Sequence, residues 1–130
     1  MRALLPPGWP RPRGYSNGIS ARGRMIFTAG VVGWDETEKF VEQDLVGQVR
    51  QVLVNTLAVL AEDGAGPEHI VRMTWYVTDR NDYVARIQEI GAVYRELIGK
   101  HFPAMAVVQV AALVESAARI EIETTAVVPE

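Results

Sequence analysis

The sequence predicts a single α+β domain over residues 1–130, with two amphipathic helices on one face of a mixed β-sheet. Two observations support this fold class. Segments with helical spacing of apolar residues alternate with short β-branched runs, and the composition does not shift along the chain. With 48% hydrophobic and 22% charged residues, the chain has the composition of a protein with one buried core.

The N-terminal part is expected to form an extended segment followed by two strands. Residues 1–14 hold four of the seven prolines, which predicts an extended lead-in because proline restricts the backbone and donates no hydrogen bond. Residues 16–21 and 24–31 have strand-like compositions on either side of a short turn, which predicts a β-hairpin. Gly30 and Gly33 then indicate a sharp turn or a close backbone approach.

Two helices are expected in the middle of the chain. Apolar residues recur at three- and four-residue spacing between Asp44, a suitable N-cap, and Gly64, a suitable stop. Residues 70–78 alternate as a strand. A second, continuous helix is expected from the capping residues 79–82 to Ile98.

The C-terminal part predicts two further strands, residues 105–113 and 119–128, joined by a polar turn. The last strand places isoleucines on one face and the carboxylates of Glu121 and Glu123 on the other. The element order is therefore ββαβαββ, with both helices on the same face of the sheet. Because no third helix exists to cover the other face, self-association of copies is expected.

Charge and composition exclude several classes of function. The net charge is −3, and the N-terminal arginines are interpreted as a solvated segment, so no nucleic-acid partner is expected; these are Arg11, Arg13, Arg22 and Arg24. The chain has no cysteine, no glycine-rich phosphate loop and only two, well separated, histidines, so neither a metal site nor a cofactor is predicted. Short apolar runs and the absence of a signal peptide predict a cytoplasmic protein without a membrane partner.

Four short motifs, in this order and spacing, resemble one known family. They are Gly14-Tyr15-Ser16, the strand sequence IFTAG at residues 26–30, the helix sequence QVRQVLVN at residues 48–55, and Pro103-Ala104 together with IEIE at residues 120–123. Over residues 14–128 the chain is similar to the RidA/YjgF (YjgF/YER057c/UK114-type) imine and enamine deaminases.

The resemblance implies a chorismate-mutase-like fold and a homotrimer with a cleft between each pair of neighbouring subunits. It also implies a reaction, the hydrolysis of reactive imines or enamines to a keto acid and ammonia, without a bound cofactor. Glu121 is then expected to orient the attacking water. Tyr15 and the backbone groups around Gly30 and Val31 are expected to line the cleft.

One position departs from the family pattern. The arginine that follows the Pro-Ala pair in the family, and that clamps the substrate carboxylate, is Met105 in this chain. Gln109 has its side chain on the same face of the expected strand as Met105, where it either binds substrate or faces solvent. Trp34 and Trp75 either line the cleft or pack in the core or trimer interface.

The sequence therefore leaves two functional hypotheses. The first is a RidA-like deaminase acting on a larger unsaturated amino acid, such as one of the 2-aminomuconate type. The alternative, motivated by Met105, is a non-catalytic binder of small metabolites or a regulatory protein. A third interpretation, a ribonuclease, is disfavoured by the acidic charge balance and the absence of a histidine pair.

Overall fold

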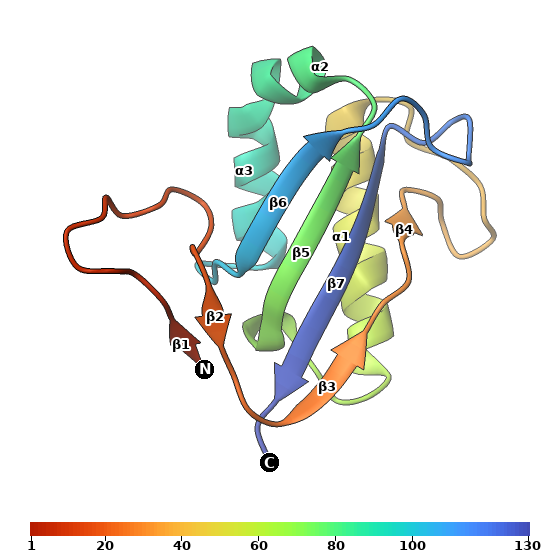
Figure 1. The fold of residues 1–130 in the computed structure, drawn as a ribbon. Coiled ribbons are helices and arrows are strands. Elements are labelled where there is room, and N and C mark those ends of the chain that lie inside the picture. Colours follow the sequence, from red (N-terminus) through yellow and green to blue (C-terminus); the bar gives the residue numbers. More distant parts are fainter.

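A mixed five-stranded sheet with helices on one face forms the body of the computed structural model, which describes residues 1–130 (Figure 1). The strands are β3 (Arg24–Phe27), β4 (Val31–Val32), β5 (Ile70–Val77), β6 (Ala104–Gln109) and β7 (Ile120–Val128). Their spatial order is β3-β7-β5-β6, and β4 also pairs with β7. Only β5 and β6 are parallel. The predicted ββαβαββ order and α+β class are confirmed.

Three helices pack on the sheet or beside it: α1 (Leu45–Ala61), α2 (Arg80–Ala85) and α3 (Ile87–Leu97). Helix α1 begins where predicted, because the Asp44 carboxylate accepts a hydrogen bond of 3.2 Å from the backbone N–H of Gly47. A short 3₁₀ helix, Pro67–His69, leads into β5. None of the helices combines the length and apolar character needed to cross a bilayer.

The hydrophobic core lies between the sheet and helices α1 and α3. Side chains from all three elements are almost fully removed from solvent, which provides the main favourable term in folding. The core includes Val49, Val52, Leu53 and Leu60 of α1, Ile90, Val93 and Tyr94 of α3, and Met73, Trp75, Val77, Ile120 and Ile122 of the sheet.

The predicted N-terminal hairpin is wrong. Strand β2 (Ile19–Ser20) pairs with β1 (Arg2–Ala3), which lies in the predicted lead-in, and β3 pairs with β7 instead. The physical reason lies at Gly23, whose φ of +147° carries the chain against the backbone carbonyl of Val128. The chain therefore joins the C-terminal strand at this point instead of folding back on β2.

Two boundaries near the site also differ from prediction. The second helix is interrupted at Arg86, whose φ of −105° and ψ of 11° are not helical, so α2 and α3 have separate axes. The strand predicted to reach residue 113 ends at Gln109, because its partner β5 ends at Val77 and offers no further ladder. Residues 110–119 instead form the connection to β7.

The sheet face away from the helices carries no covering element (Figure 1). Three large apolar side chains on this face are exposed: Met25, Phe27 and Val108, at 57%, 66% and 43%. Tyr76 and Glu121, which are register partners, lie on the same face. The uncovered face expected from the sequence is therefore present.

Candidate functional site

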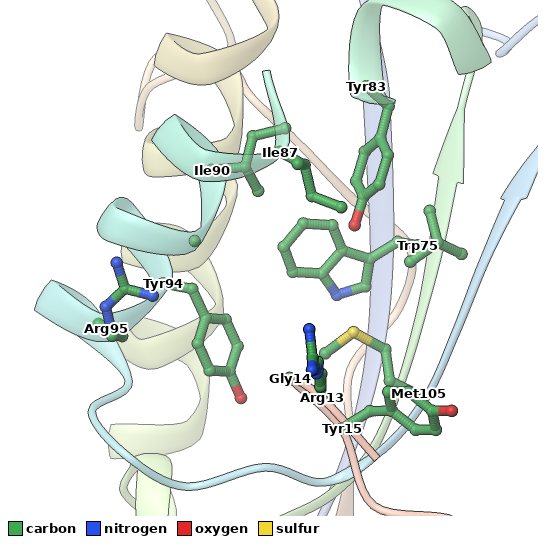
Figure 2. A pocket seen from close by; sticks show the side chains of 12 residues that line it. Arg13, Gly14, Tyr15, Trp75, Tyr83, Ile87, Ile90, Tyr94, Arg95 and Met105 are labelled. Carbon is green, nitrogen blue, oxygen red and sulfur yellow. The ribbon is translucent and has the colours of Figure 1, made fainter. Parts of the chain in front are cut away.

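A cavity of about 330 Å³ lies between the sheet and the α2–α3 segment (Figure 2). Its size is at the lower end of the range for small-molecule pockets, and eight of its twelve lining residues are hydrophobic. The lining residues are Arg13, Gly14, Tyr15, Trp75, Tyr83, Ile87, Ile90, Gly91, Tyr94, Arg95, Met105 and Val107.

Aromatic rings on three elements form the walls of this pocket. Trp75 projects from β5 and is only 2% exposed. The ring of Tyr83 meets it edge-on, and the ring of Tyr94 is tilted against it, each with a centroid separation of 6.5 Å. The interruption at Arg86 lets Tyr83 of α2 and the residues of α3 face the same ring. Met105 enters from β6, where it is the register partner of Met73.

The N-terminal segment reaches the pocket because Ser16 fastens it to the start of β6. The Ser16 hydroxyl donates to the carbonyl of Phe102 at 2.5 Å, and its backbone N–H donates to the carbonyl of Pro103 at 3.0 Å. These bonds bring the two preceding side chains, Tyr15 and Arg13, to the pocket beside Met105 (Figure 2).

Two of the polar groups in the pocket are buried phenols. Burial raises the pKa of both Tyr83 and Tyr94 above the ordinary value, at which a phenol is already neutral near pH 7. The Tyr94 hydroxyl donates to the carbonyl of His101 at 2.6 Å. The indole N–H of Trp75 is buried and has no hydrogen-bond partner.

A second group of residues lies on the uncovered sheet face. Glu121 packs directly over Gly30, so closely that a Cβ atom at position 30 would overlap its carboxylate. Glu123, two residues along, accepts a hydrogen bond of 2.7 Å from Tyr76, and this bond raises the pKa of the tyrosine. Glu121 makes no hydrogen bond or ion pair within the chain, so its carboxylate, unlike that of Glu123, is free to bind a water or a ligand.

Strand register separates these two groups. Trp75 lies opposite Ile122, and both belong to the core beneath the helices. The next pair, Tyr76 with Glu121, must point to the other face, because side chains alternate along a strand. Met105 and Glu121 are therefore on opposite faces of the sheet in one chain. A single chain cannot place both around one small molecule.

The remaining predicted residues lie apart from the aromatic pocket. Trp34 packs against Phe40, with a centroid separation of 5.8 Å, in a surface hollow that Gly30 and Val31 also line. Gln109 uses its Oε1 to accept a hydrogen bond of 2.7 Å from the backbone N–H of Arg80, at the start of α2.

The structure has no cluster of three or more histidine, aspartate or glutamate side chains able to hold a metal ion. The Nε2 atom of His101 lies 2.6 Å from the carbonyl of Ile70, which requires a proton on that nitrogen. That nitrogen therefore donates a structural hydrogen bond and has no lone pair to offer a metal ion.

Sequence reasoning missed Arg13, Tyr83, Arg95 and the α3 residues of the pocket. Tyr83, Ile87, Ile90 and Tyr94 follow the helical spacing of an apolar face, and nothing in that spacing marks a cavity beneath them. For Arg13 the available signal was its place two residues before Tyr15, which was itself expected at the cleft.

Comparison with known proteins gives consistent results. The sequence model described as endoribonuclease L-PSP matches residues 10–128. A RutC family protein of Pyrococcus abyssi is 39% identical over 106 residues, 80% of each chain. The 2-iminobutanoate/2-iminopropanoate deaminase of Salmonella typhimurium is 34% identical over 116 residues, 87% of this chain and 86% of that one. A solved Rid-family structure from Yersinia pestis has a TM-score of 0.86 at 32% identity, covering 98% of both chains.

Proposed function

The chain belongs to the endoribonuclease L-PSP family, the family of the RidA/YjgF proteins, and we therefore propose that it is a hydrolytic deaminase of reactive imines or enamines. The resemblance seen in the sequence is thus confirmed at the level of the family. The proposal of activity is supported by the carboxylate of Glu121, which is free of partners on an otherwise uncovered face.

In the proposed reaction an enamine first tautomerises to the imine, and water then attacks the imine carbon while Glu121 takes one proton from that water and passes it to the nitrogen. In the resulting amino alcohol the hydroxyl proton is transferred to nitrogen by way of Glu121, the C–N bond breaks, and a keto acid and ammonia are released. The Glu121 carboxylate makes no hydrogen bond within the chain. A carboxylate within hydrogen-bond distance of a water can act as a general base.

The proposed site needs two copies of the chain. The aromatic pocket and Glu121 lie on opposite faces of one sheet, so the pocket of one subunit must meet the Glu121 face of its neighbour. Burial of the exposed Met25, Phe27 and Val108 side chains would favour such an assembly. A closed homotrimer with three equivalent clefts satisfies both requirements.

The substrate proposed here is larger than 2-aminoacrylate. Met105 supplies neither charge nor donor, and the rings of Trp75, Tyr83 and Tyr94 offer apolar contact to a longer side chain. An unsaturated amino acid of the 2-aminomuconate type is one candidate of suitable length.

The test is the Glu121→Gln variant, assayed with 2-imino acids generated in situ from amino acids of increasing side-chain size. Loss of the general base should lower kcat by about a hundredfold or more while the variant keeps the size of the wild-type assembly. Glu123→Gln is the matched control, because Glu123 already accepts the hydrogen bond of Tyr76. Equal turnover by wild type and Glu121→Gln would refute this role.

Met105 favours one alternative, a binder of small metabolites that has kept the pocket and lost the chemistry. It predicts that wild-type protein binds organic acids in the pocket but turns over none of the imines.

A further inference from the structure

Two unpaired cations and one unpaired donor converge on the aromatic pocket. Arg13 and Arg95 both line it, and neither takes part in any of the six ion pairs of the structure. No side-chain hydrogen bond occupies either guanidinium group. Both arginines are exposed, so their guanidinium groups are open to an anion that enters the pocket.

The indole N–H of Trp75 is the stronger indication of a ligand. This donor is buried and has no hydrogen-bond partner, whereas buried donors are nearly always satisfied, because an unpaired one lowers stability. Figure 2 shows the indole nitrogen directed toward Met105 and Arg13. The thioether of Met105 is flexible, so its displacement would open the donor to a ligand.

The backbone that follows Arg13 holds this residue at the pocket. Gly14 follows it with a φ of +79°, a conformation that favours glycine, and Ser16 fastens the chain at the start of β6. Arg13 and Met105 thereby line the same pocket (Figure 2). The N-terminal segment therefore brings to the pocket a positive charge that Met105 does not carry.

We propose that the pocket binds an organic acid with an apolar or aromatic body, whose carboxylate is held by the Arg13 guanidinium and the Trp75 indole N–H. The body of the acid packs among Tyr83, Ile87 and Tyr94. Arg95 adds positive potential at the same pocket. That this acid is the substrate of a deaminase rests on the function proposed above; the binding itself does not.

The probe is 3-phenylpropionate, with its neutral isostere 3-phenylpropanamide as the comparison ligand. Binding is followed by calorimetry and by the indole N–H signals of the ¹⁵N-labelled protein. The chain has three tryptophans, so the Trp75 signal is the one that remains in both Trp9→Phe and Trp34→Phe. The acid should shift this signal and bind about tenfold or more tightly than the amide, because charge-assisted bonds are the stronger ones.

Arg13→Ala should remove the preference for the acid, whereas Arg11→Ala, an exposed arginine outside the pocket, should preserve it. Equal affinity for acid and amide, no binding of the acid, an unmoved Trp75 signal, or equal losses in the two arginine variants would each overturn the proposal. These outcomes are independent of turnover. Acid binding with no imine hydrolysis would leave this inference standing and refute the deaminase.

Discussion

At the scale of residues, the site depends on close contacts that only particular side chains permit. Gly30 gives room for the Glu121 carboxylate, and Ser16 holds the segment that carries Tyr15. The expectation that Gly30 marks a close approach was made from the sequence, since an isolated glycine in a strand is typical of one. Its partner, Glu121, lies 91 positions away in sequence, and only the fold identifies it.

Gly30→Ala should lower turnover far more than stability. The new Cβ would displace the end of a flexible side chain, so the unfolding free energy should change by less than about 1 kcal/mol. With Glu121 as the proposed general base, a shift of about 1 Å in its carboxylate costs on the order of a hundredfold in rate. Steady-state kinetics and thermal unfolding of the same preparation measure both effects. A variant with wild-type kcat would show that the position of Glu121 is not important.

At the scale of elements, local signals predicted the helices well and the strand pairings poorly. Asp44 and the apolar spacing after it located α1 because both act within a few residues. The hairpin failed because β3 finds its partner β7 about 100 residues later, which no local pattern encodes. The interruption at Arg86 also follows from tertiary packing, since Tyr83 packs on Trp75.

Gln48 joins α1 to the segment before it and to the turn before β7, and it should be a major contributor to stability. It is fully buried in α1, its Nε2 donates to the carbonyls of Glu42 and Ala117, and its Oε1 accepts from the N–H of Arg119 at 2.7 Å. Gln48→Leu would leave these backbone groups without partners.

The expected loss for Gln48→Leu is about 3 kcal/mol in chemical denaturation. Gln51→Leu, one turn along the same helix, removes a single bond to Asn55 and should cost less than about 1 kcal/mol. Similar losses of unfolding free energy in both variants would show that the three hydrogen bonds of Gln48 contribute no more than the single bond of Gln51.

At the scale of the whole molecule, one property connects the fold with the proposed function: the pocket and Glu121 lie on opposite faces of the sheet. Composition and element order were enough to predict an uncovered face, because right-handed strand–helix–strand crossovers put both predicted helices on the same face of the sheet. They did not place Arg13 at the pocket, because a proline-rich segment has no periodicity; the only signal in the sequence was the position of Arg13 two residues before Tyr15.

Assemblies that contain two different variants test most directly whether the site is shared between two copies of the chain. Glu121→Gln chains keep the pocket, and Val107→Trp chains fill it but keep Glu121, so each variant alone should be inactive. When the two are refolded together in equal amounts, a cleft works if the pocket comes from the first chain and the carboxylate from the second. Random assembly makes about a quarter of the clefts of this kind. Recovery of about a quarter of wild-type imine hydrolysis is the expected result; no recovery, with mixed assemblies shown to form, would contradict a site built from two copies.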